Sequence, residues 1–385
     1  MVLGLEILGA TIIVIIAAHH LSLAARAPRR AVAPPKAWPS VAVLRPIRGL
    51  DPGARENLDA LLEIDYPGAI EFLFLLDDAS DPSYPLVEAA VAAHPARHAR
   101  IVLTGDPPPN RTGKIHKMIV GSELVHADVL AFSDSDTRPH RGALRELVAL
   151  LEADPHNGIA FAPTVAVASD AQSGDVGYEL LVNAWYGAAI DRLADDRGEV
   201  PFAMGQFMLV RASALETIGT MRAAEGELVD DMFLGRRMIE SGFANVMSTS
   251  RVPVVIGGMR LGEFLRVFRK WLFFSQSGLP EAFKTAGWLR AVPGLGAWVM
   301  VVAGLVLSSG ALLAIGIAAV AAFTVSQARL NRAIGGAVVA LRHYWVAATL
   351  PFIAAGVALS TKLNHTVSWR GRRYFLDHAG RLRAS

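Results

Sequence analysis

The sequence predicts an α/β domain with a mostly parallel sheet, flanked by membrane segments. Between residues 38 and 258, short apolar runs alternate with segments of helical apolar spacing, which is typical of successive βαβ units. On both sides of this region the chain carries apolar stretches that are long enough to enter a bilayer. The apolar fraction of 52% agrees with a chain that is partly membrane-embedded.

Four strands are expected in the first half of this domain. The apolar runs at 41–44, 72–76, 100–103 and 128–133 predict them, and the spacing of apolar residues predicts helices at 54–64, 84–93 and 114–125. Strands that alternate with helices pair in parallel, with helices on both faces of the sheet. Ligands of such sheets bind beyond the carboxyl ends of the strands.

Acidic residues follow two of these strands. One strand ends in Asp77-Asp78 and another in Asp134-Ser135-Asp136, and the pair Asp230-Asp231 opens a later helical pattern. Carboxylates at strand ends can hold a divalent cation against a diphosphate. Asp-Ser-Asp also begins ordinary turns, and the helix dipole alone favours one acidic residue in a first turn. Three acidic clusters in one domain nevertheless favour a binding site.

Composition excludes several kinds of site. The chain has no cysteine, so disulfides and cysteine-ligated zinc are excluded, while an oxygen-ligand site for a hard cation stays possible. Lys plus Arg number 37 against 35 for Asp plus Glu, which gives a net charge of +2. This surplus is too small to indicate a nucleic-acid partner, so we expect none.

An N-terminal membrane anchor is predicted within residues 1–30. The stretch from Val2 to Ala25 is long enough to span a bilayer, and basic residues follow it at positions 26, 29, 30 and 36. Under the positive-inside rule these charges place the following domain in the cytosol. A cleaved signal peptide is the alternative, but no basic residues precede the apolar stretch.

Further membrane segments are predicted within residues 288–362. Ser308-Ser309-Gly310 interrupts an uncharged stretch at 292–325, which suits two short spans in a hairpin or one long tilted span. A last apolar segment at 344–360 has basic residues on both sides, including the basic tail 363–385. One span cannot have cytosol at both ends, so a re-entrant last segment and a tail that breaks the charge rule also stay open.

The order of several short motifs carries a family resemblance. They are Leu44-Arg-Pro-Ile-Arg-Gly-Leu-Asp-Pro52, Asp65-Tyr-Pro67, Asp78 with Asp81-Pro82, Lys114, the Asp-Ser-Asp triplet and Val229-Asp-Asp231. Together, over about residues 38–275, they resemble a family 2 glycosyltransferase of the GT-A fold. More narrowly, they resemble the ceramide glucosyltransferase branch, which includes hopanoid glycosyltransferases.

The resemblance implies a role for each of these acidic and basic side chains. Asp78 would bind the uracil or ribose of a UDP-sugar, and Lys114 its diphosphate. Asp134 and Asp136 would bind Mg²⁺ or Mn²⁺, a task that suits carboxylate oxygens. Asp231 would be the general base of an inverting transfer, because a lipid alcohol must lose its proton as the new bond forms.

Two further residues near this set receive structural interpretations. Asp230 is expected to orient its neighbour, to contact the substrate or to cap the helix. Lys117 is expected on a solvated helix face.

Family members also carry a Gln- or Arg-X-X-Arg-Trp motif that holds the leaving diphosphate. This chain has Arg266-Val-Phe-Arg269-Lys270-Trp271, so the motif fits in two registers. Aligned on the tryptophan, Lys270 replaces the arginine; aligned on the arginines, Trp271 is displaced by one. The four side chains Arg266, Arg269, Lys270 and Trp271 are the candidates for this role.

The same segment, 259–285, has the pattern of an amphipathic helix. Its basic face and aromatic residues favour a position in the membrane interface, with packing on the sheet as the alternative.

The sequence therefore predicts a multi-pass membrane enzyme, in a bacterial-type inner membrane, that transfers a hexose, most simply glucose, from a UDP-sugar to the hydroxyl of a lipid such as ceramide. A hopanoid N-acetylglucosaminyltransferase is the nearest alternative. A polysaccharide synthase would need more helices for a translocation channel, and a membrane scaffold would leave the acidic clusters unexplained.

Overall fold

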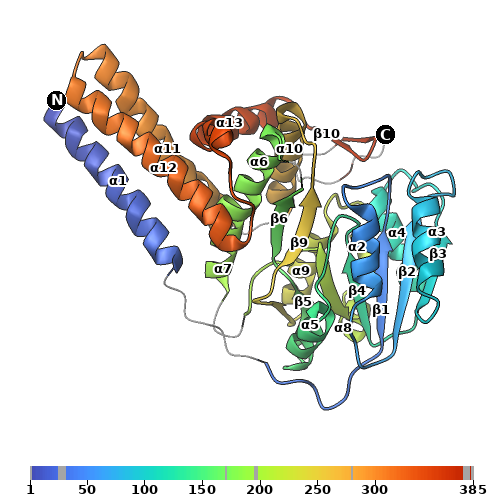
Figure 1. Cartoon of the computed structure of the whole chain (residues 1–385). Helices are drawn as coiled ribbons and strands as arrows, with labels where there is room; N and C mark the ends of the chain where they lie inside the picture. Colours follow the sequence, from blue (N-terminus) through green and yellow to red (C-terminus); the bar gives the residue numbers. More distant parts are fainter. Residues whose placement is uncertain are drawn as a thin grey trace.

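The computed structural model describes residues 2–24, 32–169, 171–194, 198–278, 281–375 and 382. Figure 1 shows an α/β domain beside a group of long helices that belong to the N-terminal and C-terminal parts of the chain. The basic residues at 26, 29, 30, 381 and 383 lie outside the described residues.

A seven-stranded sheet forms the centre of the α/β domain, in the order β3-β2-β1-β4-β7-β5-β8. Only β7 runs antiparallel to its neighbours, so the predicted mostly parallel sheet is confirmed. The four predicted strands all lie in it, with Val41 pairing with both Ile70 and Val129. The strands are β1 (Val41–Pro46), β2 (Ile70–Leu76), β3 (His98–Leu103), β4 (Val129–Ser133), β5 (Asn157–Phe161), β7 (Phe207–Arg211) and β8 (Ala244–Met247).

One face of the sheet is covered by α2 (Ala54–Leu62), α3 (Tyr84–Ala93) and α5 (Ala143–Glu152). Their apolar residues recur at helical spacing, so each helix presents one apolar face to the sheet. Leu61, Val87 and Leu144 of these helices are fully buried in one core with β1 and β2.

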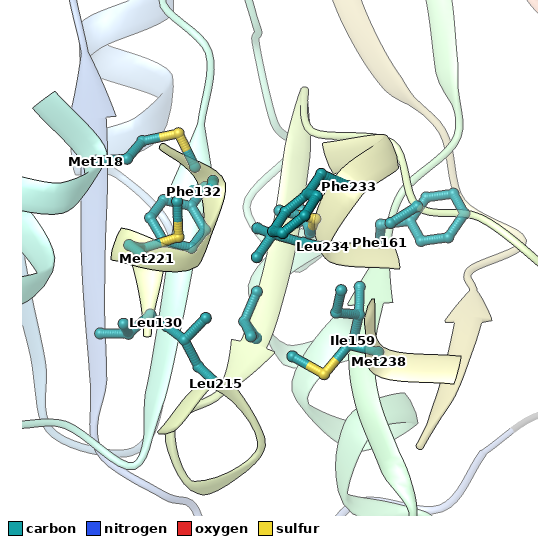
Figure 2. Close-up of a cluster of buried hydrophobic side chains, with 14 of the residues drawn as sticks. Met118, Leu130, Phe132, Ile159, Phe161, Leu215, Met221, Phe233, Leu234 and Met238 are labelled. Carbon is teal, nitrogen blue, oxygen red and sulfur yellow. The ribbon is translucent and has the colours of Figure 1, made fainter. Parts of the chain in front are cut away.

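The opposite face is covered by α4 (Gly113–Glu123), α8 (Ala212–Thr217), the short helix η2 (Met221–Ala224) and α9 (Asp230–Glu240). Figure 2 shows this core, with Phe132 of β4 and Ile159 of β5 facing Met221 and Leu234. Thr112 caps α4 by accepting a hydrogen bond from the amide of Ile115 at 3.2 Å, which fixes where this helix begins.

A smaller layer connects this domain to the membrane-side helices. The parallel strands β6 (Thr164–Ala168) and β9 (Val252–Ile256) pack beside α6 (Ser173–Glu179), which continues as a π-helix, η1 (Leu180–Gly187), and then α7 (Ala188–Leu193). Buried amides join this layer to a distant helix: Asn183 donates to Asn331 at 2.7 Å, and Asn331 donates to Glu179 at 3.0 Å. Because these polar groups are buried, their pairing fixes the two parts of the chain together.

The apolar stretch near 292–325 forms a helical hairpin, which is the first of the two predicted arrangements, and not one long helix. It consists of α11 (Glu281–Val306) and α12 (Gly310–Ile334), and α1 (Val2–Ala24) packs against both. Helices α11 and α12 approach closely because Gly316 has no side chain. A Cβ atom added at Gly316 would lie 2.6 Å from the amide nitrogen of Val301. Among the described residues, Gly310–Ile334 and Leu341–Leu363 are long and apolar enough to cross a membrane, whereas Ile7–Ile16 and Ala291–Val306 are shorter apolar segments.

The last apolar segment packs between the helical hairpin and the α/β domain. The short helix η3 (Leu341–His343) leads into α13 (Tyr344–Leu363), which packs on α6 and on α10 (Leu261–Gly278). Before it, Asn331 contacts Asn183; after it, Arg269 donates to the carbonyl oxygen of Thr366 at 2.7 Å. α13 also packs against the helical hairpin: the indole nitrogen of Trp298 in α11 donates to the carbonyl oxygen of Ala348 at 2.9 Å.

Part of the basic tail is folded. It forms an antiparallel hairpin of β10 (Thr366–Trp369) and β11 (Arg372–Phe375), and this hairpin returns to the edge of the main sheet.

Candidate active site

A cavity of about 830 Å³ lies beyond the carboxyl ends of β1 and β4. The start of α4 and the start of α9 form its floor with these strand ends, and α10 and the β10–β11 hairpin form its roof. This is the position at which parallel α/β sheets bind their ligands.

One lysine connects two of the predicted acidic clusters in the floor. The Nζ atom of Lys114 lies 2.9 Å from Oδ1 of Asp134 and 3.2 Å from Oδ2 of Asp230. Burial alone would lower the pKa of Lys114, but the attraction of Asp134 and then Asp230 outweighs it and raises that pKa. Lys114 is therefore a fixed positive charge within the acidic floor.

The loop that carries the Asp-Ser-Asp triplet is held from behind by Arg45. This fully buried side chain donates to the carbonyl oxygens of Asp134 at 2.8 Å, Thr137 at 2.6 Å and Asn57 at 2.7 Å. Burial lowers the pKa of Arg45 to about 10, so it still carries its charge at neutral pH. The position of the triplet backbone is thus set by a rigid planar donor rather than by solvent.

Asp136 has the properties of a cation ligand. Its Oδ1 atom is buried and accepts no hydrogen bond, an arrangement that is costly for a carboxylate unless a cation occupies the position. Burial, followed by repulsion from Asp134 and Asp51, raises the pKa of Asp136 to about 7. No group of three or more acidic or histidine side chains gathers around it among the described residues. The two carboxylates of the triplet would therefore share a hard cation with oxygens of a substrate.

Asp231 lines the same cavity at the first turn of α9. Its Oδ2 atom accepts a hydrogen bond from the amide of Gly205 at 2.6 Å, and Oδ1 accepts one from the amide of Met232 at 2.8 Å. Burial, followed by repulsion from Asp230, raises the pKa of Asp231 to about 7. A carboxylate with such a pKa is suited to accept a proton near neutral pH.

The family model described as glycosyl transferase family 21 matches residues 5–382. The chain belongs to this family. Ceramide glucosyltransferase 1 of Caenorhabditis elegans is 21% identical over 250 residues, which are 65% of this chain and 53% of the relative. A ceramide glucosyltransferase of Komagataella phaffii is 28% identical over 133 residues, 34% of this chain and 26% of the relative. The chain spans about half the length, or less, of these curated relatives.

A solved structure has a similar fold. It is a mannosyltransferase from Pyrobaculum calidifontis in complex with GDP-Man and Mn²⁺, with a TM-score of 0.51 and 20% identity. The match covers 93% of this chain and 99% of that one. The expected GT-A fold and the expected resemblance to ceramide glucosyltransferases are therefore confirmed.

The α10 segment of this family 21 chain has a defined register in the structure. Lys270 and Trp271 line the cavity, and Trp271 makes an edge contact with Tyr178 at 5.9 Å between ring centroids. Arg269 points away and donates to carbonyl oxygens of Asn364 and Thr366. Arg266 lines the cavity mouth with 76% of its side chain exposed. The geometry favours the alignment on the tryptophan, with Lys270 in place of the motif's arginine and Arg269 in a structural role.

Lys270 is a half-buried cation that forms no ion pair with a carboxylate in the described part of the chain. Its Nζ atom lies 5.3 Å from the ring centroid of Trp369 and 5.6 Å from that of Phe274. Burial, followed by repulsion from Arg370, lowers the pKa of Lys270 to about 8. A bound anion would relieve this repulsion.

One neighbouring prediction differs from the structure and another stays a prediction. Asp78 is exposed, outside the residues that line the cavity, and accepts a hydrogen bond from the amide of Ser80 at 2.7 Å. Lys117 is not on a solvated face: its side chain is 2% exposed and pairs with Asp77. Helical spacing alone did not reveal this buried partner, and the role of Asp78 in nucleotide binding stays a prediction.

Sequence reasoning missed three residues at the cavity. Asp51 lies in the segment Leu44–Pro52 that carries part of the family resemblance, and it accepts a hydrogen bond from Ser135 of the triplet. Arg370 and Arg372 come from the hairpin in the tail. The one local signal near Arg370 is Gly371, which suits a tight turn in a tail that we interpreted only by its charge.

Proposed function

We propose that this family 21 chain is an inverting glycosyltransferase that moves a hexose, most simply glucose, from a UDP-sugar to the hydroxyl of a membrane lipid such as ceramide. The observation that carries the proposal is the position of Asp231. Its carboxylate, with a pKa of about 7, lines the same cavity as Asp134, Asp136 and Lys270, and Lys270 forms no ion pair with a described carboxylate. The names of the curated relatives support the choice of ceramide and glucose.

In this mechanism Asp231 accepts the proton of the acceptor hydroxyl. The hydroxyl oxygen attacks the anomeric carbon, the bond from that carbon to the diphosphate oxygen breaks, and the electron pair leaves with the diphosphate. General-base assistance of this kind contributes typically about 10²- to 10⁴-fold. A single displacement inverts the anomeric configuration, whereas retention would need a carboxylate nucleophile.

The leaving diphosphate would lie between the floor and the roof. Asp134 and Asp136 would hold a Mg²⁺ or Mn²⁺ ion, which supplies positive charge to the leaving group when bound. Lys114 balances the charge of Asp134 and Asp230 and so keeps the floor from repelling an anionic donor. Lys270 supplies a cation on the opposite side.

The helices around the cavity fit a lipid acceptor. We place α11 and α12 across a membrane as a hairpin with α1 beside them, and the α/β domain in the cytosol. Asn331 before α13 and Thr366 after it both contact the part of the chain that carries the cavity, so we place α13 along the membrane surface or as a re-entrant segment rather than across the bilayer. The aromatic and apolar wall that Tyr178, Tyr186 and Trp271 form would then face the acceptor lipid.

The test uses the purified full-length protein in detergent, labelled UDP-sugars, Mn²⁺ and a panel of lipids. A monoglycosylated ceramide is the expected product. Glycosylated hopanoid would identify the alternative acceptor, and a sugar polymer would favour a synthase. Absence of any metal-dependent nucleotide-sugar binding would contradict every transferase function.

A further inference from the structure

The tip of the C-terminal hairpin reaches into the cavity in an unusual backbone conformation. Trp369 pairs with Arg372 across a two-residue turn, in which Arg370 has φ of 49° and Gly371 φ of 78°. Two positive φ angles define a type I′ turn, in which the first position usually holds asparagine, aspartate or glycine. An arginine in this conformation is disfavoured, and such strain clusters at functional sites.

The hairpin is anchored to two separate parts of the cavity wall. Val367 is 2% exposed and packs in one cluster with Leu228 and Val229, directly before the acidic pair of α9. The amide of Gly113, next to Lys114, donates a hydrogen bond to the hydroxyl oxygen of Tyr374, with 3.5 Å between the nitrogen and the oxygen. These contacts place the turn over the Asp-Ser-Asp triplet.

Arg370 is held by a carboxylate that also contacts the triplet. Its Nη2 atom lies 2.7 Å from Oδ1 of Asp51, whose other oxygen accepts a hydrogen bond from Ser135. Its Nη1 atom donates to the carbonyl oxygen of Arg48 at 3.2 Å. The side chain is 38% exposed toward the cavity, so it can rotate without unfolding the hairpin.

The roof therefore carries more positive charge than its carboxylates balance. Lys270 stacks on Trp369 of this hairpin and has no acidic partner in the described part of the chain. Arg372 pairs with Asp77 and Asp106, yet its Nη1 atom is buried and donates no hydrogen bond. Cations that converge on one cavity with unused donors are the usual signature of a phosphate site.

We propose that the C-terminal hairpin completes the donor site, with Arg370 binding the diphosphate of the nucleotide-sugar beside Lys270. The assignment rests on the proposed function. A guanidinium binds phosphate through two parallel N–H donors, which a lysine cannot do. Arg370 thus restores the forked donor that this chain lacks at position 270, and it supplies this donor from a segment about one hundred residues further along the chain.

The alternative is that Arg370 only pins the hairpin to Asp51. The two roles predict different losses. Loss of a diphosphate ligand lowers affinity for UDP much more than for UMP, whereas loss of a structural pin lowers thermal stability and affects both nucleotides alike.

The test compares Arg370→Gln with Arg373→Gln, an exposed arginine on the same hairpin that does not line the cavity. Binding of UDP, UMP and GDP to full-length protein with Mn²⁺ is measured by calorimetry, with melting temperatures in parallel. We expect Arg370→Gln to weaken UDP binding about 10- to 100-fold, the range for one charge-assisted interaction, and UMP binding by less than about 3-fold. Arg373→Gln should bind both like the wild type.

Each remaining outcome decides the assignment. Equal UDP affinity in Arg370→Gln and wild type would overturn it, as would parallel losses for UDP and UMP. Should Arg370→Gln not fold, Arg370→Lys decides instead: a UDP-selective loss of about 3-fold or more supports the fork, and wild-type affinity overturns it. If the wild type binds neither UDP nor GDP, the proposed function itself has failed.

Discussion

The floor and the roof of the cavity differ in charge and in origin. The floor consists of carboxylates at strand ends and at the first turn of α9, and all of them come from the compact α/β domain. The roof consists of Lys270 on α10 and of Arg370 and Arg372 on a hairpin that follows the last apolar helix. Acids that bind a cation and accept a proton need rigid positions, and a packed sheet edge provides them. The diphosphate must enter the site and leave it, and the cations that contact it lie on peripheral segments. This comparison predicts that changes in the floor reduce catalysis or metal affinity and that changes in the roof reduce donor affinity.

The largest effect is expected at Asp231. Asp231→Asn keeps the size and one of the two backbone-amide acceptors but removes the base, so the transfer rate should fall by about 10²- to 10⁴-fold. UDP affinity should change little. Asp65→Asn, on an exposed residue that pairs with Arg145 outside the cavity, is the matched control and should retain the wild-type rate. Substantial turnover by Asp231→Asn would remove this residue from its role.

A second change in the floor addresses the cation. Asp136→Asn should raise the Mn²⁺ concentration that supports half-maximal donor binding by at least about 10-fold, since even residues behind a metal ligand cost this much when changed. Titration of Mn²⁺ at fixed UDP measures it. An unchanged Mn²⁺ requirement would mean that Asp136 is not a ligand, and its unpaired oxygen would need another explanation.

In the roof, adjacent residues of α10 separate the two roles. Lys270→Gln should weaken UDP binding by about 10-fold, because it removes a cation that has no carboxylate partner among the described residues. Arg269→Gln should leave UDP affinity intact and lower the melting temperature, because that side chain holds the carbonyl oxygens after α13. If the two variants exchanged these phenotypes, the motif would align on the arginines instead.

The smallest predicted effect is a pH dependence that involves both surfaces. Asp231 must be ionised to accept a proton, and its pKa is about 7, so the rate should rise as pH increases toward 7. Lys270 must be protonated to bind phosphate, and its pKa is about 8, so donor affinity should fall as pH rises above 8. Rate profiles of the wild type and Lys270→Gln test this pairing: only the alkaline limb should disappear in the variant.

The amino-acid sequence predicts the floor better than the roof, for physical reasons. Strand periodicity and the carboxylates that follow it are local, so the sequence alone places Asp134 and Asp136 at the sheet edge. Lys117 was placed in solvent because helical spacing alone does not reveal a buried carboxylate partner. Arg370 depends on the chain returning to the domain after its apolar helices, and no local pattern encodes that return.

The anomeric configuration of the product tests the central claim most directly. The wild-type protein, supplied with an α-linked UDP-hexose, Mn²⁺ and ceramide, should yield a β-linked glycolipid. NMR identifies this linkage from the coupling constant of the anomeric proton. A β product agrees with one displacement assisted by Asp231. An α product would require a second displacement by a carboxylate nucleophile and would contradict the assignment of Asp231 as a base.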